Sequence, residues 1–142
     1  MQQKLIQLGF DLGSYGADGS FGQCTLDAEK GIQSASGITT DGIVGSATNS
    51  KVSEWLSKPS CGASTPHFSQ SEFKCPCCGS LGGGMKTSLL LRLEALKAKL
   101  GGKSIRINSG YRCAKHNAEG ILGNGGLGRY NSLYHLKFLF LQ

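Results

Sequence analysis

The sequence predicts an α+β fold built in two parts, and three observations support this prediction. A turn motif occurs twice in the first part of the chain, each time before a segment that suits a short helix. Further on, leucines recur at helical spacing, and a later segment alternates apolar with polar residues as a half-buried strand does. With 142 residues, 22 of them glycine and 39% hydrophobic, the chain suits one ordinary domain or two small ones.

Charge divides the chain in a similar way. Residues 1–59 hold four lysines and six acidic residues, whereas residues 60–142 hold eleven basic and three acidic residues. A basic part attracts polyanions such as nucleic acid or an anionic cell wall. Because no basic run exceeds two residues and no ladder of aromatic residues accompanies the charges, we favour the wall polymer over nucleic acid. No apolar run approaches the ~20 residues that a membrane span needs.

The repeated turn motif reads DGSFGQCT from position 18 and DGIVGSAT from position 41. Asp-Gly favours a tight turn, and the second glycine permits a left-handed backbone. We predict that the final threonines, Thr25 and Thr48, cap the helices that follow. The apolar residues between the glycines, Phe21 and Val44, are predicted to pin the turns to a core. Together with the apolar segment at the start, this pattern predicts three helices joined by two turns of one design.

These turns, the opening QQKLIQLGF and the glutamine at Gln33 resemble the peptidoglycan-binding domain of bacterial and phage wall hydrolases in order and spacing. The resemblance implies a small three-helix module over residues 1–56 that binds the glycan or the stem peptide of peptidoglycan. It does not identify the contact residues. Asp18 and Asp41 suit a structural role as well as a ligand-binding one.

The next segments predict a linker, a helix and a strand. Residues 57–66 (SKPSCGASTP) have the composition of a linker. Leucines at positions 89, 93, 96 and 100 define one face of an amphipathic helix that ends at two glycines, and we predict a core helix without chemistry. Ile105 and Ile107 alternate with polar residues, which predicts a half-buried strand leading to a turn at Ser109-Gly110.

HFSQSEFKCPCCG, this helix and IRINSGYRCAKHN, in that order, are similar to the zinc-dependent D-alanyl-D-alanine peptidases of the LAS type. The resemblance implies an α+β zinc-peptidase-like domain over residues 67–142. It also implies zinc as cofactor and hydrolysis of a D-alanyl bond in peptidoglycan as the family activity.

Two family positions have counterparts in this chain. Arg112 matches the arginine of the family's SGYR motif, which implies a role in holding the oxyanion or the substrate; a surface arginine at a turn is the other interpretation. His135 is the residue that matches the first metal ligand. The aspartate ligand, the second histidine and the basic glutamate have no counterparts, since no aspartate follows Asp41. A catalytic zinc needs about three protein ligands, so we expect a domain that is incomplete at its C-terminus, from a truncated or frame-disrupted coding region.

The cysteines offer a rival metal site. Cys75, Cys77 and Cys78 could supply soft ligands to a structural zinc, joined by one more cysteine or by a histidine. The candidates for the fourth ligand are Cys61, Cys113 and His67.

A disulfide such as Cys78–Cys113 is an equally good use of the same thiols. His67 and His116 are predicted to serve structure. A nucleophilic pair of Cys113 and His116 is disfavoured because the two lie too close in sequence for the usual protease geometry.

The sequence therefore predicts a bacterial or phage cell-wall protein whose partner is peptidoglycan and whose site of action is the cell wall. The start of the chain shows no secretion signal, which suits release of the phage type. Two alternatives stay open: a non-catalytic peptidoglycan-binding protein, and a zinc-stabilised basic adaptor that binds nucleic acid.

Overall fold

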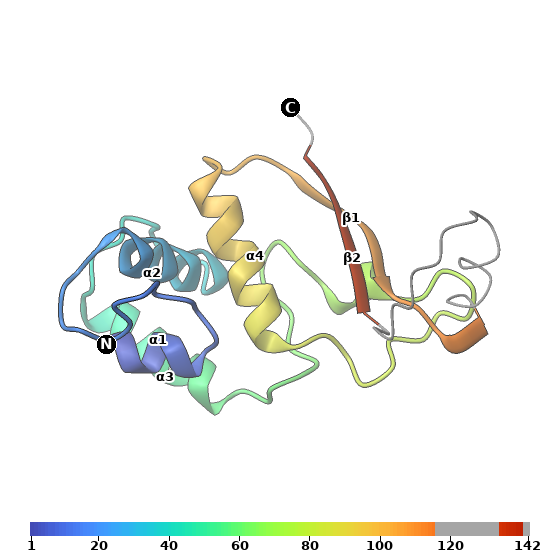
Figure 1. The fold of residues 1–142 in the computed structure, drawn as a ribbon, viewed down its shortest axis with the longest axis horizontal. Coiled ribbons are helices and arrows are strands. Elements are labelled where there is room, and N and C mark those ends of the chain that lie inside the picture. The colour runs from blue at the N-terminus through green and yellow to red at the C-terminus, as the bar shows by residue number, and fades with distance from the viewer. Residues whose placement is uncertain (116–133, 141–142) are drawn as a thin grey trace.

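Helices build the first part of the chain and a two-stranded sheet lies in the second, in a computed structural model that describes residues 1–115 and 134–140 (Figure 1). The predicted α+β class is confirmed. The elements in chain order are α1 (Gln2–Gln7), α2 (Gln23–Ala35), α3 (Ser46–Ser57), the 3-10 helix η1 (Gln70–Phe73), α4 (Thr87–Lys99), β1 (Ile105–Tyr111) and β2 (Tyr134–Phe140).

The first three helices enclose a hydrophobic core, as the sequence predicts. Leu5 of α1, Ile32 of α2 and Val52 of α3 are fully buried there, and Trp55 is nearly so. The Trp55 indole N–H also donates a hydrogen bond to Ser36 Oγ at 2.9 Å, which ties α3 to the end of α2.

The second repeated turn is held by Gln33, a buried residue of α2. Its Nε2 lies 2.8 Å from Asp41 Oδ1, 3.1 Å from the Ile43 carbonyl and 3.3 Å from Thr48 Oγ1. Its Oε1 accepts a hydrogen bond from the Gly42 N–H at 2.7 Å. One side chain thus contacts polar groups at four positions of the motif.

Gln2 of α1 makes the same set of contacts with the first turn. Its Nε2 reaches Asp18 Oδ1, the Ser20 carbonyl and Thr25 Oγ1 at 2.9–3.3 Å, and its Oε1 accepts from the Gly19 N–H at 2.8 Å. The duplication seen in the turn motif therefore extends to the helix that precedes each turn.

Three expectations about these turns are wrong. The second glycines, Gly22 and Gly45, have φ of −91° and −96° and are not left-handed. The helices begin with Gly22 and Gly45 as N-caps, and no side chain caps either helix. Thr25 and Thr48 are instead buried and contact the two glutamines. Phe21 is 56% exposed and does not pin its turn to the core, because the glutamine already holds the turn from inside.

Helix α4 lies between the first three helices and the sheet (Figure 1) and has more buried surface than the predicted single face. Leu91 joins the core of the first three helices, whereas Leu90 and Leu93 join a second core around Phe68, Phe73 and Met85. Leu96 and Leu100, which the pattern placed on the core face, are only half-buried.

The contact between α2 and α4 is close. A Cβ at Gly31 of α2 would lie 2.5 Å from the Cβ of Ala95 of α4. A glycine is needed here because the two helix backbones approach each other.

The segment predicted as a linker, residues 57–66, lies against the start of α4. The Thr87 N–H donates to the Ser60 carbonyl at 2.8 Å, and Cys61 forms a single antiparallel bridge with Lys86. Thr65 is buried.

Strands β1 and β2 pair antiparallel, with Ile105 opposite Phe140 and Tyr111 opposite Tyr134. The turn predicted at Ser109-Gly110 is wrong, because β1 continues through both residues to Tyr111 with shifts of register on either side of Ser109. Gly110 lies flat against the backbone of Phe73, so that a Cβ there would collide with it. The irregular register brings β1 onto η1 and carries the chain on to Arg112 and Cys113.

Candidate functional site

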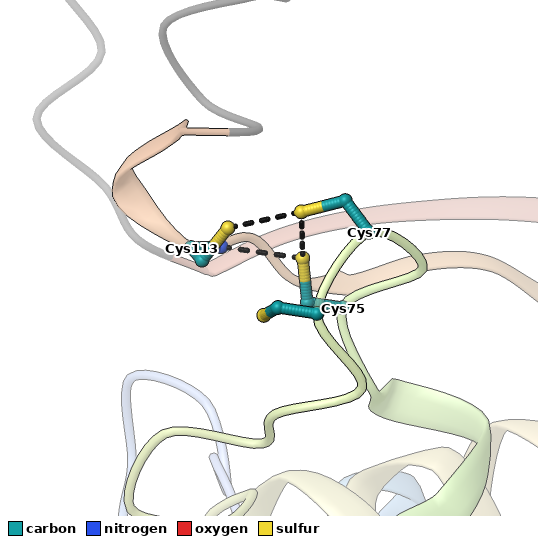
Figure 2. A group of neighbouring side chains, drawn as sticks. Cys75, Cys77 and Cys113 are labelled. Atoms are coloured by element: carbon teal, nitrogen blue, oxygen red, sulfur yellow. Dashed lines mark hydrogen bonds between the residues drawn. The ribbon is translucent and has the colours of Figure 1, made fainter.

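Four cysteine sulfurs meet between the loop before α4 and the end of β1. The Sγ atoms of Cys75, Cys77, Cys78 and Cys113 all lie within 4.8 Å of one another. Figure 2 shows the thiols of Cys75, Cys77 and Cys113 turned toward one another. The Sγ of Cys77 lies 3.4 Å from that of Cys75 and 3.1 Å from that of Cys113.

Backbone hydrogen bonds place these thiols. The Cys75 N–H donates to the Ser80 carbonyl and the Gly79 N–H donates back to the Cys75 carbonyl, both at 2.8 Å, which closes the loop on itself. Gly79 has a φ of +67°, a left-handed conformation that glycine adopts without strain. The Cys113 N–H points at Cys75 Sγ at 3.4 Å and so joins the strand end to the loop.

Crowding of the thiols makes ionisation of the exposed ones unfavourable without a cation. Hydrogen bonds with the Cys113 and Cys75 thiols raise the pKa of Cys77 to about 12. For Cys78, a hydrogen bond from the Ser80 backbone lowers the pKa, but desolvation and the Cys113 and Cys75 thiols outweigh it, so the pKa is raised. A metal ion reverses this preference, since bound thiols are deprotonated.

The other candidate ligands of the sequence lie elsewhere. Cys24 is exposed on α2, and Cys61 is paired through its backbone with Lys86. His67 donates its backbone N–H to Glu94 Oε1 at 3.1 Å, and its Nδ1 lies 2.8 Å from Glu94 Oε2. Of the three candidates for a fourth ligand, the structure brings only Cys113 to the other thiols.

Arg112 and His135 are the two residues that match the peptidase motifs. Arg112 follows β1 directly, is half-buried, and stands next to Cys113 in the cluster. His135 lies on β2, the partner strand of β1, but its side chain falls outside the described part of the structure. His116 also lies outside the described residues.

The donors of this chain do not fit the three-ligand catalytic zinc of the resembled family. Residues 60–142 contain no aspartate, and their acidic residues are Glu72, Glu94 and Glu119. Glu72 Oε1 accepts the Ser69 N–H at 2.7 Å, and Glu94 is fully buried with its oxygens bonded to Ser34 and His67. Glu119 lies outside the described residues. We therefore derive no catalytic step through zinc.

A surface hollow lies beside the first repeated turn. It has a volume of about 400 Å³ and is lined by residues that include Tyr15, Asp18 and Gln23. The Tyr15 side chain is 83% exposed, an unusual position for a large aromatic residue. Sequence reasoning missed this hollow, and it also missed Gln2, whose spacing from Asp18 differs from that of Gln33 from Asp41.

Within residues 1–115 and 134–140, no helix is long and apolar enough to cross a membrane.

Comparison with known proteins matches each part of the chain separately. Residues 1–52 match the family model of the peptidoglycan binding domain, and residues 66–135 match that of Peptidase M15. N-acetylmuramoyl-L-alanine amidase CwlL of Bacillus licheniformis is 50% identical over 48 residues, which cover 34% of this chain and 13% of that protein.

The zinc D-Ala-D-Ala carboxypeptidase of Streptomyces albus G is 32% identical over 112 residues. That match includes 72% of this chain and 42% of the carboxypeptidase, so the chain spans less than half the length of these relatives. The two family matches occur in the order that the sequence motifs predict. The chain therefore contains a peptidoglycan-binding domain followed by a Peptidase M15 domain.

Proposed function

We propose that this protein acts at the bacterial cell wall, where the helical module of residues 1–56 binds peptidoglycan and holds the M15 domain of residues 67–142 against it through segment 57–66. One observation supports the binding role above all: both turns of the module are complete, each held by a glutamine in the same way. Because both turns are intact, the surface that they form, which we propose for binding, is intact as well.

The hollow beside the first turn is the place we propose for the ligand. An exposed aromatic ring next to polar side chains suits a sugar, because the ring packs on the apolar face of the sugar while its hydroxyls form hydrogen bonds. Tyr15 supplies such a ring, and the volume of about 400 Å³ lies in the range of small-ligand sites.

Charge adds a second, less specific attraction. The basic residues gathered in positions 60–142 favour a wall polymer that carries carboxylates and phosphates. This contribution weakens as salt rises, because exposed charges are screened over about 10 Å at 0.1 M ionic strength.

The test is sedimentation of the full chain with purified peptidoglycan. We expect the wild-type chain to sediment, and Tyr15→Ala to weaken binding about tenfold, a loss of about 1.4 kcal/mol. Ile43→Ala is the matched control, since Ile43 is 68% exposed on the second turn and lies outside the hollow. Equal binding by the wild type and Tyr15→Ala would contradict the proposed place, and no sedimentation of the wild type would contradict the function.

We infer that recognition, and not bond cleavage, is the role of these 142 residues. His135 is the one match to the zinc ligands of the resembled family, and a single imidazole does not hold a catalytic zinc. We expect no release of D-alanine from peptidoglycan by the zinc-supplemented chain. Release that is lost in His135→Ala would overturn this inference, and a mobility shift of DNA or RNA without wall binding would favour the nucleic-acid adaptor.

A further inference from the structure

We propose that Cys75, Cys77, Cys78 and Cys113 bind one zinc ion as a structural site, which fastens the loop before α4 to the end of β1. The four proposed ligands do not include His135, the histidine of the peptidase motif, and the proposal does not depend on the proposed binding of peptidoglycan.

The spacing of the sulfurs suits a tetrahedral zinc. Four thiolates at the usual Zn–S distance of about 2.3 Å stand about 3.8 Å apart. The measured contacts of Cys77 with Cys113 and Cys75 are 3.1 and 3.4 Å, and no pair in the group exceeds 4.8 Å. Small adjustments of side-chain angles therefore bring all four sulfurs to one ion.

The local sequence supports the same interpretation. Cys75 and Cys78 have the two-residue spacing of zinc-binding loops, and the glycine that follows them closes the turn in a left-handed conformation. Cys77 lies between them and Cys113 comes from a distant part of the chain, as in sites that join two segments. Four thiolates select a soft or borderline metal over magnesium or calcium.

The surroundings suit a charged metal centre. One zinc with four thiolates has a net charge of −2, and its thiols release their protons on binding. The Cys113 N–H points at Cys75 Sγ, a hydrogen bond that a thiolate accepts more strongly than a thiol. Arg112 and Lys115 flank Cys113, and Lys74 precedes Cys75, so positive charges adjoin the cluster in sequence.

A disulfide is the competing use of these thiols. The Sγ atoms of Cys77 and Cys113 are 3.1 Å apart, and a bond of about 2.05 Å between them would leave Cys75 and Cys78 as two thiols facing it. Zinc employs all four sulfurs at once. In the part of the chain that the structure describes, no other group of cysteine, histidine and acidic side chains comes this close together.

Binding would have a consequence for the residue next to the site. The short sheet reaches Cys113 through an irregular register, and the metal would hold that end of β1 to the loop. Arg112 stands between β1 and Cys113, so zinc would restrict where its guanidinium can lie.

The experiment measures zinc per chain in the full protein, purified under reducing conditions and dialysed against metal-free buffer. We expect about one zinc for the wild type, and at least a tenfold loss for Cys77→Ser and for Cys113→Ser. Cys24→Ser is the control, since Cys24 is exposed on α2 and does not belong to the group of neighbouring thiols. Replacement of zinc by cobalt is expected to give the strong thiolate-to-cobalt absorption of a four-sulfur site.

A serine variant could lose zinc because it fails to fold, so a second variant keeps the test decisive. Cys77→His restores a ligand of the kind found in three-cysteine, one-histidine sites, and we expect it to bind zinc with an altered cobalt spectrum. Loss of zinc from His135→Ala with retention in Cys77→Ser would overturn the proposal. A count of free thiols in denatured protein that has not been reduced is the second check. Four free thiols in place of six would show a disulfide and would also overturn the proposal.

Discussion

At the scale of single residues, Glu29 of α2 is a group whose burial opposes folding. Its side chain is fully buried, and neither carboxylate oxygen has a hydrogen-bond partner among the described residues. Burial penalises the charged form and raises the pKa of Glu29 above its ordinary value of 4.5. A carboxyl group in this position destabilises the native state at neutral pH.

We therefore predict that Glu29→Met raises the free energy of unfolding at pH 7 by on the order of 1–3 kcal/mol, the cost of a buried unsatisfied polar group. In the wild type, the contribution of Glu29 to stability falls as pH rises above 4.5, because the unfolded chain ionises this carboxyl group while the folded chain resists its ionisation. Urea unfolding at pH 4 and pH 7 measures both effects. A gain for Glu29→Met that is as large at pH 4 as at pH 7 would contradict the electrostatic cause.

The repeated turns show what the sequence could predict at this scale. The Asp-Gly pairs indicated the position of each turn correctly, because backbone preference is a local property, and their glycines, Gly19 and Gly42, are left-handed with φ of +87° and +78°. The expectation for the second glycine of each motif was wrong, since neither second glycine is left-handed. The roles of Thr25 and Phe21 were wrong because each depends on Gln2, which reaches the turn from a helix far upstream in sequence. Contacts of this kind leave no local signal.

At the scale of elements, the packing of α2 against α4 is the main contact between the first three helices and the rest of the chain. The leucine pattern predicted α4 and its end just before the two glycines. It marked one buried face, however, whereas α4 packs against two cores. Periodicity reports which residues are apolar, and it does not report how many partners a helix has. Leu90 and Leu91 lie next to each other in sequence and are buried in different cores.

The packing of α2 against α4 leads to a prediction about the stability of a variant at Gly31. Glycine to alanine in a helix interior usually stabilises by about 1 kcal/mol. Here we expect Gly31→Ala to destabilise by about 1–3 kcal/mol, because the new Cβ would meet that of Ala95.

The control is the pair of changes Gly31→Ala with Ala95→Gly, which moves the methyl group from one helix to the other. We expect the double variant to be more stable than the sum of the single changes indicates, as measured by urea unfolding. Strict additivity would show that the two positions do not touch.

At the scale of the whole molecule, Glu94 connects segments that the sequence assigned to different parts. It lies on α4, accepts a hydrogen bond from Ser34 Oγ of α2 at 2.8 Å, and bonds both the backbone and the ring of His67. Desolvation raises the pKa of Glu94, but hydrogen bonds from Thr65, His67 and Ser34 outweigh it, so the pKa is lowered from 4.5. The ionised carboxylate is the form that the fold stabilises.

We predict that Glu94→Ala lowers the free energy of unfolding at pH 7 by about 2–3 kcal/mol, because it removes the carboxylate that accepts hydrogen bonds from Ser34 and His67. The contribution of Glu94 is present above the unfolded pKa of 4.5 and is lost as pH falls through the lower folded pKa. Acid titration followed by circular dichroism tests this, since the loss caused by Glu94→Ala should shrink below pH 4.

Glu54→Gln is the control for this prediction, because Glu54 forms salt bridges with Lys51 and Lys58 while remaining 46% exposed. We expect its unfolding curve at pH 7 to match that of the wild type closely. A large loss in the control would assign the effect to charge in general and not to the buried position of Glu94.

The order of the two family matches could be predicted from the motifs, and the cysteine cluster could be predicted in part. Three of its residues follow one another in sequence and were clear candidates, whereas Cys61, Cys113 and His67 competed for the fourth place. Only the packing of β1 against η1 and the contact of Cys113 with the loop decide among them. Sequence motifs identified the candidate cysteine and histidine ligands. Tertiary contacts determine which of these ligands lie together.

Helix α4 has a consequence for how such proteins can be recombined. Leu91 and Ala95 belong to the second part in sequence, yet they complete the packing of the first three helices. An exchange of residues 1–56 for an unrelated module would leave this side of α4 without a matching surface. The smallest transferable unit therefore ends beyond the helical module, after the residue where α4 stops, at Lys99.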